Sequence, residues 1–399
     1  MDFLQEAQEL QPDLQRIRRT LHAHPEVGLD LPETQRRVLE ELDGLPLEIS
    51  VGERTTSVVA VLRGTHENRS DSSPVVLLRG DMDGLPIEEL SGEEFASVNG
   101  AMHACGHDLH TAGLIGAARL LCEHRDQLAG DVVFMFQPGE EGYGGARVMI
   151  EEGIINAAGR PAAHAYGIHV NTDPKGLLRT RPGALQASSN SLFVTVVGEG
   201  GHGSQPHEAH DPVPALAEIV TALNTMVTRR LNVFDPLVMS ITMLQGGSAI
   251  NIIPEKVSLG ATVRAFSKQA LDTFETEANR IARGIADAHG CRTEVTFDRV
   301  YPVTVNDPSE TEWVLSELAQ TFGDDRVNVL EGPIMPSEDF SFVLNEVPGT
   351  YIMLGARRPD VPSDQPVADN HSPFVVFDDS VLGDQAAALA HLAAERLKP

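Results

Sequence analysis

The chain has 399 residues, which is too long for one ordinary compact core and predicts two or three domains. Its 58 acidic and 30 basic side chains give a formal net charge of −28, and such a surface repels nucleic acid and anionic membranes because phosphate binding needs clustered Lys and Arg. Three cysteines, Cys105, Cys122 and Cys291, are too few and odd in number for a disulfide framework.

The apolar stretches are short and interrupted, and the acidic N-terminus lacks a signal-peptide pattern. These features predict a globular cytoplasmic protein that does not insert into a membrane.

The first half of the chain alternates between strand-like and helix-like segments. Residues 1–45 have helical spacing that must break near Pro25, because proline disfavours helix in the residue before it. The pattern then predicts strands at 58–63, 75–79, 132–136 and 165–169, and helices at 109–122 and 146–152. Strands that alternate with helices favour an α/β layer with a largely parallel sheet.

The pattern changes near residue 186. Strand, helix, strand, strand, helix and strand follow at 192–197, 214–230, 237–244, 257–265, 269–288 and 293–297. This order is typical of a small α+β unit of the ferredoxin-like kind. After residue 301 the chain returns to helix at 309–320, strand at 350–354 and helix at 380–397. We therefore predict a catalytic domain formed by 1–185 and 300–399, with an inserted domain at 186–299.

Five potential metal ligands fall at predicted strand ends or in loops: Cys105, His107, Glu141, His169 and His371. A transition metal at neutral pH prefers imidazole, thiolate and carboxylate ligands from elements that meet in space. The carboxyl ends of strands in α/β sheets are where such groups converge, and Glu141 and His169 both sit there.

Each of these residues also has an ordinary interpretation. A single histidine is usually a surface or hydrogen-bonded core residue, and a free cysteine is usually a small buried hydrophobe. Two adjacent carboxylates such as Glu140 and Glu141 are usually solvated. Here, however, the pair follows an apolar strand and a Pro-Gly turn, and together with the Cys/His pair it favours a site.

Several motifs occur in an order that resembles one family, the metallopeptidases that include bacterial carboxypeptidases and aminoacylases. The resemblance is closest to the branch of hippurate hydrolases and plant indole-acetyl-amino-acid hydrolases, and it covers nearly the whole chain. The motifs lie at residues 18–26, 79–86, 103–107, 137–141, 200–207, 251–254 with Arg264, 336–340 and 371–373.

The resemblance implies a zinc-exopeptidase-like catalytic domain that binds two divalent ions, with manganese, zinc, cobalt and nickel all chemically possible. Cys105 would bridge the two ions as a thiolate. His107 and His169 would complete one ion, and Glu141 and His371 the other. Glu140 would be the general base, and Asp81 would orient a ligand without binding metal itself.

The inserted domain would be a lid that also forms a homodimer. The glycine-rich segment 198–203 lacks the Lys-Ser/Thr of a phosphate-binding loop, which makes that alternative weak. By resemblance, His202 reaches the neighbouring subunit's site and stabilises an oxyanion there, while Asn251 and Arg264 bind the free carboxylate of the substrate.

The predicted function is metal-dependent hydrolysis of the amide bond in N-acyl-amino acids, such as hippurate-like or N-acetyl substrates. A carboxypeptidase or dipeptidase that acts on short peptides is the alternative, since the chemistry is the same and only the acyl pocket differs. A non-catalytic binding protein on the same fold is disfavoured by the complete set of ligands beside Glu140.

Overall fold

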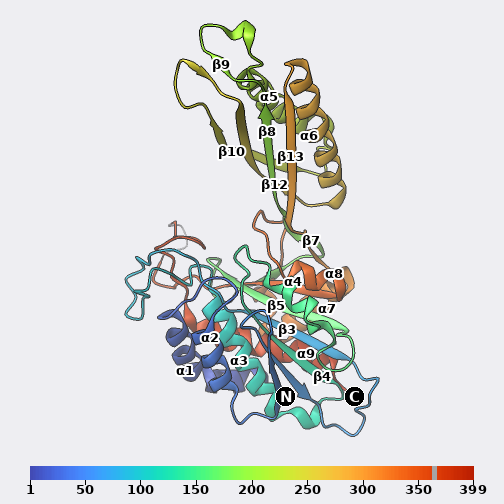
Figure 1. Ribbon diagram of the computed structural model, residues 1–399. Helices are drawn as coiled ribbons and strands as arrows, with labels where there is room; N and C mark the ends of the chain where they lie inside the picture. The colour runs from blue at the N-terminus through green and yellow to red at the C-terminus, as the bar shows by residue number, and fades with distance from the viewer. Residues whose placement is uncertain (362–365) are drawn as a thin grey trace. The chain divides into compact units, whose positions relative to one another are not determined.

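A computed structural model describes residues 1–361 and 366–399. The chain divides into two compact units (Figure 1). The first contains Met1–Leu185, Val305–Gly332 and Asp339–Pro399, and the second contains Gln186–Thr304 and Pro333–Glu338. The short strands β7 (Gly183–Gln186) and β14 (Thr304–Asn306) pair where the chain passes from one unit to the other.

The first unit is built on an eight-stranded sheet in the order β1-β2-β4-β3-β5-β16-β6-β15. The four central strands, β4, β3, β5 and β16, are parallel, which confirms the predicted largely parallel α/β layer. The strands are β1 (Leu47–Val51), β2 (Val58–Arg63), β3 (Val75–Asp81), β4 (Asp131–Gln137), β5 (His164–Asn171), β6 (Leu178–Thr180), β15 (Val327–Val329) and β16 (Gly349–Gly355).

Burial on both faces explains the apolar runs of the central strands. Every residue of β3, β4 and β16 is buried, as expected for parallel strands covered by helices. The sequence did not predict strands β1, β6 and β15, which are three to five residues long; β1 and β15 form the two edges of the sheet and are largely exposed. Such short strands carry little alternation to detect.

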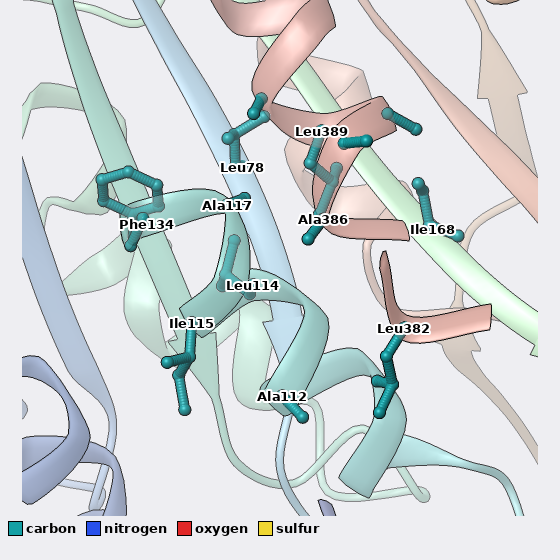
Figure 2. Close-up of a cluster of buried hydrophobic side chains, with 14 of the residues drawn as sticks. Leu78, Ala112, Leu114, Ile115, Ala117, Phe134, Ile168, Leu382, Ala386 and Leu389 are labelled. Carbon is teal, nitrogen blue, oxygen red and sulfur yellow. The ribbon is translucent and has the colours of Figure 1, made fainter. Parts of the chain in front are cut away.

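Helices α3 and α9 supply most of the contacts on one face of this sheet. In Figure 2, Leu114 and Ala117 of α3 and Leu382, Ala386 and Leu389 of α9 gather beside Leu78, Phe134 and Ile168 of the sheet. The two helices pack closely because α3 has glycine at position 113, where a Cβ atom would lie 2.4 Å from the Gln385 side chain. The helices of this unit are α1 (Phe3–His22), α2 (Pro32–Leu42), α3 (His107–Glu123), α4 (Gly145–Glu151), α7 (Pro308–Phe322), α8 (Ser341–Glu346) and α9 (Leu382–Arg396).

The second unit has the predicted ferredoxin-like arrangement. Its four antiparallel strands lie in the order β10-β12-β8-β13, and helices α5 and α6 share one apolar core with them. Both helices begin at a side-chain cap, Asp211 for α5 and Ser267 for α6. The elements are β8 (Ser189–Val197), β9 (Gly201–His202), α5 (Pro212–Arg230), β10 (Leu237–Gly246), β11 (Ile252–Ile253), β12 (Lys256–Ala265), α6 (Lys268–Ala288) and β13 (Arg292–Tyr301).

None of the helices within the described parts of the chain combines the length and the apolar character needed to cross a bilayer.

Candidate metal centre

All five predicted metal ligands lie in the first unit, and they form two groups that share one residue. The candidate ligand atoms of Cys105, His107 and His169 all lie within 4.8 Å of one another, and so do those of Cys105, Glu141 and His371. They come from the loop before α3, the first residue of α3, the turn after β4, strand β5 and the loop before α9. Because β4 and β5 are both parallel to β3, their carboxyl ends lie at the same edge of the sheet, as the sequence predicted.

A single glycine makes it possible for Cys105 and His107 to face the same point. Gly106 has φ +86°, and a Cβ atom at this position would lie 2.3 Å from the Val170 side chain. Any other residue would therefore combine left-handed backbone strain with a clash against β5. The glycine turns the chain sharply enough that both neighbours point toward His169.

Backbone carbonyls fix which nitrogen of two histidines faces the centre. His107 Nδ1 donates to the Asp83 carbonyl at 2.8 Å, and His169 Nδ1 donates to the Val170 carbonyl at 2.7 Å. Both rings therefore carry their proton on Nδ1 and turn Nε2 inward. The His169 Nε2 atom lies 3.4 Å from Cys105 Sγ.

The ligand group of Cys105, Glu141 and His371 also brings its side chains close together. Glu141 Oε1 lies 3.2 Å from His371 Nε2 and 3.9 Å from His107 Nε2. His371 adopts φ 69°, which is unusual for a residue other than glycine, while its backbone N–H donates to the Ala104 carbonyl at 2.9 Å. This conformation is the only positive φ of a non-glycine residue in the described chain, and it belongs to a candidate ligand.

Two of these atoms are buried but lack a hydrogen bond of normal geometry. Among the described residues, neither His107 Nε2 nor Glu141 Oε1 makes a hydrogen bond of normal geometry, although His107 Nε2 lies 3.2 Å from Asp81 Oδ2 and Glu141 Oε1 lies 3.2 Å from His371 Nε2. Buried polar atoms without partners are costly in a folded protein and call for an explanation. A metal ion bound at each of the two ligand groups would supply the missing contact.

The electrostatics also suit a cation. Burial alone would raise the pKa of the Cys105 thiol, but the imidazoles of His169, His107 and His371 outweigh this effect and hold that pKa well below its usual range. The neighbouring Cys105 and Glu141 raise the pKa of His371 to about 10. Cys105 and Glu141 therefore favour positive charge beside them, which an imidazolium or a metal ion can supply.

Asp83 is a site residue that sequence reasoning missed. Its two carboxylate oxygens accept the backbone N–H groups of Glu140 and Glu141, each at 3.0 Å, while its carbonyl accepts from His107 Nδ1. One buried residue thus fixes the direction of both glutamates and of one histidine. The Asp-Met-Asp spacing after β3 was the available signal, because alternate residues at a strand end point to the same side.

Asp81, predicted to orient a ligand, is buried and contacts both His107 and His110. Its Oδ2 accepts from Arg79 Nη1 at 2.8 Å and lies 3.2 Å from His107 Nε2, while its Oδ1 accepts from His110 Nδ1 at 2.6 Å. His110 was also missed. Burial lowers the pKa of His110 to about 4, despite the opposing effect of Asp81, and keeps this imidazole neutral.

The other three predicted residues lie in the second unit. His202 is exposed on β9, which pairs with β11, and the Asn251 carbonyl accepts from the backbone N–H of Gly203. Arg264, near the end of β12, is partly buried, and its Nη1 atom has no hydrogen-bond partner among the described residues. Burial lowers the pKa of Arg264.

Comparison with known proteins agrees with this geometry. Residues 77–395 match the profile of peptidase family M20/M25/M40. The chain is 36% identical to thermostable carboxypeptidase 2 of Saccharolobus solfataricus, covering 97% of this chain and 95% of that protein. It is 34% identical to IAA-amino acid hydrolase ILR1-like 5 of Arabidopsis thaliana, covering 96% and 86%.

A solved structure is similar over the whole chain as well. It is a dinuclear metal-binding peptidase of the M20 family from Bacillus subtilis, with a TM-score of 0.82 and 31% identity over 98% of this chain and 99% of that one. The chain therefore belongs to peptidase family M20/M25/M40 and is a metal-dependent hydrolase of the amidohydrolase and peptidase type.

Proposed function

We propose that this protein hydrolyses the amide bond of N-acyl-amino acids, with two divalent ions held by Cys105, His107 and His169 and by Cys105, Glu141 and His371. The observation that carries the proposal is the pair of ligand groups that share Cys105. The dinuclear centre named for the Bacillus subtilis relative supports a count of two ions.

The residues present fit such ions. Two ligands at about 2.0 and 2.3 Å from one tetrahedral ion stand about 3.5 Å apart, and Cys105 Sγ and His169 Nε2 are 3.4 Å apart. The buried atoms His107 Nε2 and Glu141 Oε1, which make no hydrogen bond of normal geometry, would each gain a contact with a metal ion. A set of imidazoles, a thiolate and a carboxylate favours manganese, zinc, cobalt or nickel over the hard cations magnesium and calcium.

When bound, two such ions polarise the scissile carbonyl and lower the pKa of a water molecule. Glu140 is the residue placed to accept the proton of that water and to return it to the departing amine. Its side chain is buried at the centre, and its backbone is held by Asp83. A general base must lie within hydrogen-bond reach of the proton it takes, and the Glu140 carboxylate lies in one group with His107 and Glu141, two of the candidate ligands.

Arg264 supports a substrate with a free carboxylate. The side chain makes no hydrogen bond or ion pair with the described residues, and its Nη1 atom is buried. Burial of an arginine without a counter-ion is unfavourable, whereas a guanidinium binds a carboxylate with two parallel hydrogen bonds. We propose that Arg264, with Asn251, binds the carboxylate of the amino-acid half.

Arg264→Ala should raise KM for an N-acyl-amino acid by about 10–100-fold and change kcat little, because the carboxylate is bound equally in the ground and transition states. The same substrate with its carboxylate converted to an amide should be cleaved poorly by both enzymes and should show no further loss in the variant. Arg299→Ala is the matched control, since Arg299 lies in the same unit but already pairs with Asp272 and Glu275. An unchanged KM in Arg264→Ala would remove this residue from the substrate site.

We propose further that the second unit forms a two-fold dimer and that His202 acts in the partner's active site as an oxyanion donor. The edge strand β10 supports pairing, because an exposed edge is a surface for another chain and Val238, Met243 and Leu244 on it are exposed. A two-fold contact uses the same patch on both chains.

Subunit exchange tests this assembly. His202→Ala and Glu140→Gln homodimers should each be nearly inactive, but a mixed dimer has one site with neither lesion and one with both. Activity should recover to about half of the wild-type value per mixed dimer, by counting intact sites under two-fold symmetry. If mass spectrometry shows exchange and no activity returns, His202 does not act across the interface.

A carboxypeptidase or dipeptidase is the second candidate, and the identity to thermostable carboxypeptidase 2 favours it. Amino-acid release from acetyl-, benzoyl- and indole-acetyl-amino acids, compared with dipeptides and longer peptides at equal concentration, separates the two. The proposal expects the acyl-amino acids to have the higher kcat/KM. A preference for peptides would replace it with the second candidate.

A further inference from the structure

His110 lies between two candidate ligands without being available to a metal itself. Its ring centroid is 5.4 Å from that of His107 and 4.7 Å from that of His169. The side chain is fully buried in the first turn of α3. Its Nδ1 atom lies 2.6 Å from Asp81 Oδ1, and its Nε2 atom lies 2.9 Å from the Val170 backbone nitrogen. Both nitrogens are therefore engaged.

The partners fix the position of the proton on this ring. The Val170 backbone N–H can only donate, so His110 Nε2 must accept. The single proton of the neutral imidazole is then on Nδ1, and it is donated to the Asp81 carboxylate. One tautomer alone satisfies both contacts, which leaves no lone pair directed at an ion.

These two hydrogen bonds join the elements that carry one ligand group. Asp81 ends β3, His110 follows His107 by one turn of α3, and Val170 follows His169 in β5. Asp81 is itself held by Arg79 Nη1 and by the Thr111 hydroxyl, which donates to the Asp81 carbonyl at 2.7 Å. The ring thus bridges helix and sheet at the point where His107 and His169 converge.

We propose that His110 is a positioning residue that sets the separation and direction of His107 and His169, and so the affinity of the Cys105–His107–His169 group for its divalent ion. The inference rests on the proposed function for the existence of that ion. Neither hydrogen bond of His110 involves Glu141 or His371. We therefore expect the ion held by Cys105, Glu141 and His371 to depend less on His110.

The test measures Co²⁺ binding to protein from which metal has been removed with a chelator. Competition with a chelator gives the affinity for each ion. The visible and the thiolate charge-transfer absorption report the coordination of each bound Co²⁺. His110→Ala should lower the affinity for one of the two ions by about 10–100-fold, as loss of an outer hydrogen-bond partner does, and should alter the spectrum of that ion while the other binds normally. His110→Asn retains a donor near Asp81, and His110→Gln retains an acceptor near Val170. Both should fall between His110→Ala and the wild type.

Leu121→Ala is the control for general destabilisation, because Leu121 is buried in the same helix but distant from the ligands in sequence. It should lower Tm and leave both Co²⁺ affinities unchanged. The positioning role would be overturned if the wild-type protein binds two Co²⁺ and all three His110 variants bind them with the same affinity and the same spectrum. If the wild-type protein binds no Co²⁺, the proposed function itself fails, so the two failures are distinguishable.

Discussion

Glu140→Gln should lower kcat by about 10²–10⁴-fold, since a positioned general base contributes that much to a proton-transfer step. The amide has the same size as the carboxylate but cannot accept the proton. Metal content and KM should stay close to wild type, because the backbone contact with Asp83 that holds this residue does not involve the side chain. Steady-state kinetics and elemental analysis on the same preparation measure both quantities.

The neighbouring residue provides the matched control. Glu141→Gln should lose metal, because Glu141 Oε1 is the carboxylate atom nearest His371 Nε2, at 3.2 Å. Its kcat per bound metal pair should fall less than that of Glu140→Gln. Near-normal kcat in a fully metallated Glu140→Gln enzyme would assign the base to another residue.

Complete removal of metal should abolish activity. Imidazole, thiolate and carboxylate ligands converge on one centre, and two of the candidate ligand atoms, His107 Nε2 and Glu141 Oε1, make no hydrogen bond of normal geometry within the described protein. Mn²⁺, Co²⁺ or Zn²⁺ should restore activity, whereas Mg²⁺ and Ca²⁺ should not, because imidazole and thiolate bind these transition-metal ions more strongly than they bind Mg²⁺ or Ca²⁺.

Cys105→Ser tests the metal requirement by substitution of a ligand. Because Cys105 belongs to both ligand groups, its loss should reduce binding of both ions, whereas His371→Ala should reduce binding of one. The number of Zn²⁺ ions bound per chain, measured at a fixed concentration of free Zn²⁺, distinguishes the two variants. Full activity in a sample shown by elemental analysis to be metal-free would contradict the metal requirement.

The sequence predicted the main elements of the fold because their patterns are strong. The buried runs of β3 and β4 and the apolar helix α3 are visible without a structure, and they place Glu141 and the Cys105 loop near one sheet edge. The order of elements in the second unit likewise indicated its ferredoxin-like sheet.

The supporting residues could not be predicted in the same way. Asp83 and His110 act through contacts with the Glu140 backbone and the Val170 backbone, which are distant in sequence and depend on the order of strands. A polar residue inside an apolar helix, as His110 is, indicates only that some partner exists. His110 finds its partners because β3 and β5 are neighbours in the sheet. The hydrophobic periodicity of the sequence does not specify which strands pair.

Anomalous diffraction from crystals of the Zn²⁺- or Co²⁺-loaded enzyme, recorded at the absorption edge of the metal, would locate the two ions bound through Cys105. We expect two peaks about 3.5–4 Å apart, both in contact with Cys105 Sγ, one beside His107 and His169 and the other beside Glu141 and His371. An active, metal-loaded crystal with no peak at Cys105, or with its metal bound by Asp81 and His110, would contradict this expectation.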